Sequence, residues 1–292
     1  MTIPTKTLKS GFTLPAYGLG LWGMGGRQEA DTTEDAKQIA AIRAALDADI
    51  THFDTAELYG DGHAEELLGQ AIQGYDRSKL TIVTKVLPAH MNYDDLKASF
   101  NASLTRLGTD YVDLYLLHKY PDPGTNIADT MRAMDELVEQ GLVKNIGVCN
   151  MQPSYFDEVQ KHTKNKLVCN QVHYNVMVRE VEQKGVLEQC QQTDTMLVAW
   201  GPVQKGMLPD EPLIQEIATK YGKTPTQVAI NWLVSQSNVV TISKTSSAEH
   251  LMENLGALNW QMDAQDIERI RQEYPNQLSV SDRLPLDYPA DI

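Results

Sequence analysis

Short apolar runs and longer segments of helical periodicity alternate along nearly the whole of this chain. Runs of strand-like composition occupy residues 17–22, 51–56, 80–86, 111–118, 143–150, 167–174, 196–203 and 239–244. Each run is followed by a segment whose apolar residues recur at helical spacing. Continuous apolar strands are typical of a parallel sheet that is covered on both faces. Eight such strand and helix pairs predict a (β/α)8 TIM barrel.

The segments between the runs carry the usual signals of helix ends. Gly141 and Gly222 are expected to end helices, and Thr224-Pro225 is expected to open one. The expected helices span residues 36–48, 63–72, 95–107, 131–141, 153–161, 180–190, 224–236, 247–258 and, beyond the eighth pair, 263–274.

The two ends of the chain lie outside the β/α alternation. Residues 1–16 are expected to form a β-hairpin that turns at Ser10-Gly11, and residues 275–292 form an aperiodic tail. A chain of 292 residues is long enough for two ordinary domains or one large barrel. No Gly/Ser/Pro-rich linker interrupts the alternation, so residues 1–292 are expected to form a single barrel domain.

Composition excludes several classes of function. The net charge of −14 and the pI near 4.9 argue against nucleic acid or anionic membrane as partners, because either would repel this surface. No window reaches the roughly 18 apolar residues of a membrane span, and the N-terminus lacks the apolar core of a signal peptide. The three widely spaced cysteines fit a reducing cytoplasm, and neither they nor the histidines have zinc-site spacing. No metal is expected.

One short motif suggests a nucleotide site but stands in the wrong context. Residues 18–23, GLGLWG, match G-x-G-x-x-G, which marks a dinucleotide site only between a strand and the helix that it opens. Here the glycines lie within the first strand-like run, and MGGRQEADTT follows before helical spacing begins. The glycines are expected instead to let this strand and its loop pass close to a ligand.

Polar side chains stand at the ends of three successive runs. The second run ends at Asp54, with Tyr59 just beyond it, the third reaches Lys85, and the fourth ends at His118. Taken one at a time, each of these residues also has an ordinary structural explanation. The aspartate is consistent with a helix cap or turn, the tyrosine with an aromatic at the rim, the lysine with a solvated charge, and the histidine with a hydrogen-bonded structural residue. In a (β/α)8 barrel, however, catalytic groups gather at the carboxyl ends of the strands. A lysine in an apolar strand also needs an acidic partner, and Asp54 on the adjacent strand is the natural candidate.

The group as a whole suits the reduction of a carbonyl. A carbonyl that receives hydride needs a proton, and a tyrosine with a pKa near 10 is a poor acid unless its anion is stabilised. A lysine ammonium about 4 Å away would stabilise that anion by roughly 4 kcal/mol before desolvation is subtracted. Asp54 would keep Lys85 charged, and His118 would hold the carbonyl oxygen by a hydrogen bond.

These residues resemble those of the aldo-keto reductase family, and the resemblance covers nearly the whole chain. It rests on HFDTAELYG (52–60), TKV (84–86), YVDLYLLHKYPDP (111–123) and MDELVEQGLVKNIGVCN (134–150). The resemblance implies a catalytic tetrad of Asp54, Tyr59, Lys85 and His118, with Tyr59 as the general acid. It also implies a nicotinamide cofactor that lies extended across the barrel mouth without a Rossmann domain.

The resemblance further implies the positions of the cofactor-binding residues. Asn150 and Gln171 match the residues that hold the carboxamide, although Cys149 stands where the family usually has serine. Trp200 replaces the ring-stacking tyrosine and keeps an aromatic face. The pyrophosphate would be wrapped by Gly201, Pro202, Val203 and Lys205.

The segment after the eighth run bears on the choice between NADP(H) and NAD(H). The family commonly has proline and arginine where this chain has Ser243 and His250, and histidine cannot grip a 2′-phosphate as arginine does. NADP(H) is favoured, with NAD(H) as the alternative. The residues that match the family around this site, or lie at its expected helix start, are Lys244, Thr245, Ser246, Glu253 and Asn254.

The resulting hypothesis is a cytoplasmic reductase of small carbonyl compounds, with aldehydes as the preferred substrate class. Trp22 and Tyr120 are candidate substrate contacts, although each is also consistent with a core or surface aromatic. Two alternatives stay open: a cofactor-sensing accessory subunit of the same fold, and a barrel enzyme of another kind, such as a phosphate-binding isomerase or lyase. The sequence does not identify the physiological substrate or the oligomeric state.

Overall fold

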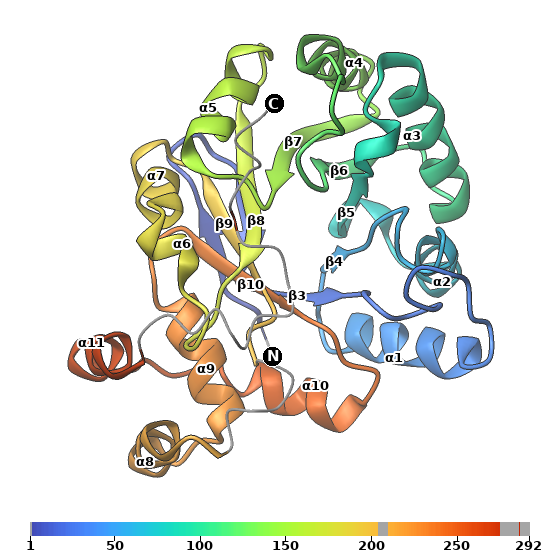
Figure 1. The fold of residues 1–292 in the computed structure, drawn as a ribbon. Helices are drawn as coiled ribbons and strands as arrows, with labels where there is room; N and C mark the ends of the chain where they lie inside the picture. Colours follow the sequence, from blue (N-terminus) through green and yellow to red (C-terminus); the bar gives the residue numbers. More distant parts are fainter. Residues whose placement is uncertain (1, 204–209, 275–285, 287–292) are drawn as a thin grey trace.

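The computed structural model describes residues 2–203, 210–274 and 286, and it contains a closed barrel of parallel strands. Figure 1 shows the strands at the centre with helices around them. Around the barrel the order is β10-β3-β4-β5-β6-β7-β8-β9, so each strand pairs with its neighbours in sequence, and β10 closes onto β3. The strands are β3 (Tyr17–Gly20), β4 (His52–Asp54), β5 (Thr81–Val86), β6 (Val112–Leu117), β7 (Val143–Cys149), β8 (Leu167–His173), β9 (Met196–Trp200) and β10 (Val239–Ser243). The predicted (β/α)8 barrel is confirmed.

The helices follow the strands as the periodicity predicts, except that the helix at Pro212–Tyr221 was not among those expected. Within the described residues they are α1 (Asp35–Asp47), α2 (His63–Ala71), α3 (Tyr93–Leu107), α4 (Ile127–Glu139), α5 (Pro153–Lys161), α6 (Glu180–Gln183), α7 (Val186–Gln192), α8 (Pro212–Tyr221), α9 (Pro225–Val234), α10 (Ala248–Leu255) and α11 (Ala264–Glu273). Short 3-10 turns lie at η1 (Arg77–Lys79) and η2 (Pro88–His90). Two apolar layers pack between the barrel and these helices.

Local signals set several of the helix ends. Thr224 forms a capping box with Gln227 at the start of α9, where Pro225 takes the first helical position. Gly222 follows α8 in the left-handed region, as does Gly141 after α4. One expectation was wrong: the helix expected over residues 180–190 is two helices. Gly185 has a φ of 72°, which breaks the helical path between α6 and α7.

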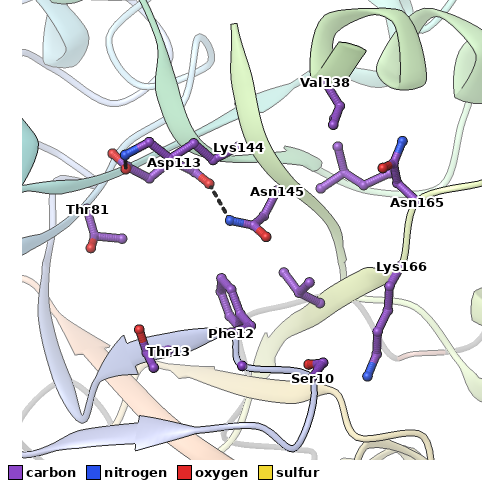
Figure 2. A pocket seen from close by; sticks show the side chains of 13 residues that line it. Ser10, Phe12, Thr13, Thr81, Asp113, Val138, Lys144, Asn145, Asn165 and Lys166 are labelled. Atoms are coloured by element: carbon purple, nitrogen blue, oxygen red, sulfur yellow. Dashed lines mark hydrogen bonds and ion pairs between the residues drawn. The ribbon is translucent and has the colours of Figure 1, made fainter. Parts of the chain in front are cut away.

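The amino-terminal hairpin closes the end of the barrel at which the strands begin. β1 (Thr5–Thr7) pairs antiparallel with β2 (Thr13–Pro15), and Gly11 provides the turn with a φ of 92°. Leu8 and Leu14 of the hairpin are buried against apolar side chains that fill the barrel interior. A cavity of about 530 Å³ lies beside the hairpin, near the first residues of β5, β7 and β8, and Figure 2 shows the side chains that line it. The hairpin therefore lies away from the opposite rim, where the strands end.

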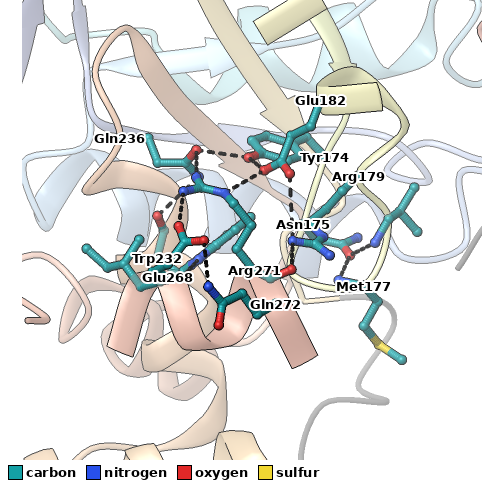
Figure 3. A network of polar contacts seen from close by, with 12 residues as sticks. Tyr174, Asn175, Met177, Arg179, Glu182, Trp232, Gln236, Glu268, Arg271 and Gln272 are labelled. Carbon is teal, nitrogen blue, oxygen red and sulfur yellow. Dashed lines mark hydrogen bonds and ion pairs between the residues drawn. The ribbon is translucent and has the colours of Figure 1, made fainter. Parts of the chain in front are cut away.

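The last described helix is held to the barrel by a polar network. Figure 3 shows Arg271 of α11 reaching Glu182 and Gln236, at nitrogen–oxygen distances of 3.3 and 2.9 Å. Glu182 also accepts a hydrogen bond from the Tyr174 hydroxyl at 2.5 Å. The network ties α11 to the segments after β8 and α9. Most of the tail expected at 275–292 lies outside the described residues, but Leu286 is buried in the same apolar layer as α11.

Candidate active site

A buried lysine at the carboxyl end of the barrel contacts both an aspartate and a tyrosine. The Lys85 Nζ atom lies 2.6 Å from Asp54 Oδ1, 2.7 Å from the carbonyl oxygen of Thr55 and 3.0 Å from the Tyr59 hydroxyl. Adjacent parallel strands place Asp54 and Lys85 side by side, since Asp54 pairs with Val83 in the β4–β5 register. Their side chains are 1% and 0% exposed, so the ion pair forms out of water.

The loop after β4 is folded so that Tyr59 turns back over Lys85. The Tyr59 backbone N–H donates to the Ala56 carbonyl, and Gly60, with a φ of 58°, donates to the Arg27 carbonyl. A Cβ atom at Gly60 would meet the backbone of Gly25 at 2.1 Å, so the close approach of these two loops requires glycine. The ammonium of Lys85 also lies 4.7 Å from the centre of the Tyr59 ring.

Burial and charge act in opposite directions on the two proton-bearing groups. Desolvation raises the pKa of Tyr59 to about 12, and the nearby Lys85 charge offsets only part of that rise. Desolvation is the largest effect on Lys85 and would lower its pKa, but the neighbouring groups, Asp54 foremost among them, together outweigh it and the pKa is raised. Tyr59 is therefore protonated and Lys85 charged at neutral pH. The sequence indicated that Lys85 lowers the pKa of Tyr59, but it could not show that burial raises this pKa by more.

His118, just after β6, faces the same tyrosine. The two rings meet edge to face with their centres 5.7 Å apart. Burial, together with the charges of Lys85 and Lys119, holds the pKa of His118 well below its usual value. Within the described residues its Nδ1 atom is buried without a hydrogen-bond partner. A buried imidazole nitrogen without a hydrogen-bond partner, next to a phenol, can form that hydrogen bond with a ligand.

The two candidate substrate contacts occupy different environments. Trp22 is 38% exposed and meets the Tyr59 ring edge to face, at a distance of 5.0 Å between ring centres. Tyr120 packs against Tyr155 instead, and its hydroxyl accepts a hydrogen bond from the backbone N–H of Gln152 at 2.8 Å. Trp22 thus borders the proton-bearing group, whereas Tyr120 holds the start of α5.

The two expected carboxamide ligands lie next to these residues. The Gln171 Nε2 atom donates to Asp54 Oδ2 at 2.7 Å, which leaves Oδ1 for Lys85. Asn150 follows β7 with a φ of 58°, and its Nδ2 atom lies 3.4 Å from the His118 carbonyl oxygen. The Cys149 thiol lies 3.9 Å from the Gln171 Oε1 atom. The amides and the ion pair therefore form one connected group.

The end of β9 contributes an aromatic plane to the same rim. The Trp200 indole stacks on His173, with ring centres 4.0 Å apart and an angle of 6° between the planes. Its Nε1 atom lies 3.3 Å from Asn150 Oδ1. Gly201, with a φ of 72°, follows β9, and Pro202 and Val203 come next. Lys205 lies outside the described residues.

The segment after β10 divides into exposed and buried positions. Lys244 and His250 are exposed, and Ser246 is partly buried. The Thr245 hydroxyl bonds within the turn that precedes α10, and Ser247 caps that helix by accepting from the His250 N–H. Lys244 and His250 are therefore the side chains of this segment that are open to an anion.

In the following helix, Asn254 is buried and Glu253 is partly buried. The Asn254 amide is buried and donates to the hydroxyls of Tyr17 and Ser243 at 3.0 and 3.1 Å. The Glu253 carbonyl accepts a hydrogen bond from Gln227 of α9. In this structure the two residues join α10 to the barrel.

Packing explains the first glycine of the run at residues 18–23. A Cβ atom at Gly18 would lie 2.6 Å from Nδ1 of His52 on the neighbouring strand, so a histidine ring fills this space. At Gly20 the nearest contacts would be ordinary, at 3.8 Å. The strand does not open directly into a helix, because α1 begins only at Asp35. The expected approach of a ligand to the glycines of this strand and its loop stays a prediction.

Two contributors to the site were missed by sequence reasoning. The Thr55 carbonyl that binds Lys85 is a backbone group, so no residue type marks it. His173 could have been found, because it stands two residues after Gln171 and alternate strand residues share a face. In the described part of the chain, no three His, Cys, Asp or Glu side chains are grouped to hold a metal ion. None of the described helices is long and apolar enough to cross a membrane.

Comparison with known proteins shows that this eight-stranded parallel barrel belongs to a class of oxidoreductases. Residues 16–274 match the aldo/keto reductase family. The methylglyoxal reductase YeaE of Escherichia coli (strain K12) is 33% identical over 269 residues, covering 90% of this chain and 92% of that protein. The chain therefore belongs to the aldo/keto reductase family, and the expected resemblance is confirmed.

Solved structures agree with this assignment. A thermostable aldo-keto reductase, crystallised with the inhibitor epalrestat, has a TM-score of 0.89 and 40% identity, covering 92% of this chain and 99% of that one. An aldo-keto reductase from Klebsiella pneumoniae in complex with NADPH has a TM-score of 0.85 and 32% identity, covering 99% and 100%. Both the barrel and the family are thus supported over almost the full length of the chain.

Proposed function

We propose that this protein reduces aldehydes and ketones to alcohols with NADP(H), and that Tyr59 is the general acid. The observation that carries this proposal is the placement of the Lys85 ammonium, which contacts Asp54 and the Tyr59 hydroxyl in a dry site at the barrel rim. Membership of the aldo/keto reductase family supports the same reaction class.

The proton chemistry follows from the charges of the site. With a pKa of about 12, Tyr59 holds its proton at neutral pH and can give it to a carbonyl oxygen. As the proton leaves, the phenolate gains the full attraction of Lys85, which Asp54 keeps charged. His118, kept neutral by its lowered pKa, would donate an N–H hydrogen bond to the same oxygen and orient the carbonyl.

The amide and aromatic groups of the rim fit a nicotinamide ring. Asn150 and Gln171 offer both donors and acceptors for a carboxamide, and Trp200 offers a flat face for the ring. When bound, the cofactor supplies the hydride that the carbonyl carbon receives. Because Gln171 contacts Asp54, the carboxamide would be held beside the Asp54–Lys85 ion pair that adjoins Tyr59. Gly201, Pro202, Val203 and Lys205 would line the path of the pyrophosphate.

We infer a preference for NADP(H) from the segment after β10. Lys244 is exposed there, and His250 lies in the first turn of α10, whose amino-terminal end favours an anion. The Klebsiella pneumoniae relative, which was crystallised with NADPH, supports this choice. Thr245 and Ser246 would contribute from the same turn, whereas Asn254 is already bonded to Tyr17 and Ser243.

The proposed substrates are small aldehydes. Trp22 meets the Tyr59 ring edge to face and is 38% exposed, so an apolar or flat substrate can pack against it. The methylglyoxal reductase among the relatives supports a small carbonyl compound. We also propose a cytoplasmic location, since all three cysteines are buried free thiols.

The proposal is tested by following NADPH and NADH oxidation with a panel of small aldehydes, ketones and aldoses. Tyr59→Phe should abolish reduction and leave the Kd for NADPH within about twofold of wild type, because only the acid is removed. Tyr75→Phe is the matched control, since its hydroxyl donates to Asp47 at the surface. Turnover retained by Tyr59→Phe would show that the acid lies elsewhere, and absence of binding to either cofactor would reject the reductase itself.

A further inference from the structure

Two neighbouring side chains hold the aromatic plane of Trp200. His173 and Trp200 are register partners on β8 and β9, and their rings lie nearly parallel at 4.0 Å. The indole edge is also held, because Nε1 lies within hydrogen-bond distance of Asn150 Oδ1. A Cβ atom at Gly201 would meet the His173 ring at 3.0 Å, so the imidazole also fills the space beside the β9 exit. One face of the indole is therefore covered by His173, and a ligand ring can stack only on the other.

The protonation of His173 can be read from its neighbour Asn175. The Asn175 side-chain oxygen accepts hydrogen bonds from the backbone N–H groups of Met177 and Val178, at 2.9 and 2.8 Å. The amide orientation is thereby settled, and its NH2 group must face the other way. That NH2 group donates to the Gly201 carbonyl at 2.8 Å and lies 3.3 Å from His173 Nε2.

An N–H donor facing Nε2 requires this ring nitrogen to be an acceptor. This contact favours the neutral tautomer of His173, with its proton on Nδ1. A proton on Nε2 would point at the amide hydrogens of Asn175, which cannot turn away without losing both of the bonds from Met177 and Val178.

We propose that His173, held neutral by Asn175, is a positioning residue for the nicotinamide ring. It supports Trp200 from behind, so that the indole presents one fixed face to the cofactor. The neutral form matters because an imidazolium stacked behind the indole would repel the positively charged oxidised ring. This role rests on the proposed function. It adds to the site a second ring, which holds the indole in position.

The first test measures cofactor affinity in variants of the stack. Kd values for NADPH and NADH are obtained by titration of cofactor fluorescence. His173→Ala should weaken both by a similar factor, roughly 3- to 10-fold, the scale of one aromatic pair, because the stack acts on the nicotinamide and not on the 2′-phosphate. His173→Phe keeps a flat ring behind Trp200 and should restore most of the affinity. His162→Ala, at the surface end of α5, is the control.

The outcomes separate this role from a structural one. Wild-type affinity in His173→Ala, a loss confined to NADPH, or a His173→Phe variant as weak as His173→Ala would each overturn the proposal. Thermal unfolding of all variants identifies any loss due to misfolding. If wild type binds neither cofactor, the proposed function fails and the positioning role fails with it.

A second test needs no cofactor. Long-range ¹H–¹⁵N NMR of the imidazoles in the wild-type protein, with the His173 signals assigned by their absence from His173→Phe, reports which nitrogen carries the proton. We expect the proton on Nδ1 at neutral pH. An Nε2–H tautomer or an imidazolium would overturn the proposed role of Asn175 even if the reductase activity is confirmed.

Discussion

Replacing Lys85 with methionine removes the ammonium group that contacts Asp54 and Tyr59 while keeping a side chain of similar length. In the native site the ammonium lies 3.0 Å from the Tyr59 hydroxyl. At that distance, and at an effective dielectric constant of about 20, it stabilises a phenolate by about 5.5 kcal/mol, or about four pKa units. We therefore expect kcat for aldehyde reduction to fall by about 10²- to 10⁴-fold, with the full Coulomb energy as the upper bound.

The same change should also destabilise the fold. Asp54 would be left as a buried carboxylate without its cation, and breaking a buried ion pair in this way costs about 3–5 kcal/mol. The double variant Asp54→Asn/Lys85→Met removes both charges and should recover most of this free energy of unfolding. It should not recover activity, because the phenolate still lacks a neighbouring cation.

The assay combines steady-state NADPH oxidation with unfolding in urea. Lys79→Met is the matched control, because Lys79 lies on η1 just before β5 and its side chain is 78% exposed. If Lys85→Met kept kcat within about tenfold of wild type, the electrostatic role of Lys85 would be refuted. Recovery of activity in the double variant would show that Lys85 acts only through the stability of the site.

Three further predictions follow from burial, packing and charge. Burial lowers the pKa of His52 from 6.5 to about 4, so between these values only the unfolded chain binds the proton and stability falls as pH falls. Between pH 7 and pH 4, the His52→Gln variant should lose about 3 kcal/mol less unfolding free energy than the wild type. Gly18→Ala should destabilise the protein by about 1–3 kcal/mol in urea, because its methyl group meets the His52 ring, whereas Gly20→Ala should change stability much less; equal effects would exclude this cause. His250→Arg should lower the Kd for NADPH more than that for NADH, and equal changes would place residue 250 away from the 2′-phosphate.

The sequence alone was sufficient for the barrel and for the rim positions of the main site residues. Both depend on local patterns: apolar runs alternate with helical periodicity, and parallel strands bring their carboxyl ends to one rim. Asp54, Lys85 and His118 could therefore be grouped without coordinates, and the Lys85–Asp54 contact follows from neighbouring strands. Helix ends were also predictable where one residue type sets them, as at Gly222 and Thr224.

The tertiary structure decided which polar groups meet and how far each is buried. Gln171 reaches Asp54 across 117 positions of sequence, and Asn254 turns inward to Tyr17 across 237 positions, pairings that no local pattern encodes. The pKa of Tyr59 is raised despite the nearby Lys85, because desolvation depends on everything packed around the phenol. Periodicity is a property of neighbouring residues, whereas burial and side-chain pairing are properties of the assembled barrel. The sequence therefore identified the groups that could do the chemistry, and only the fold determined their protonation and their partners.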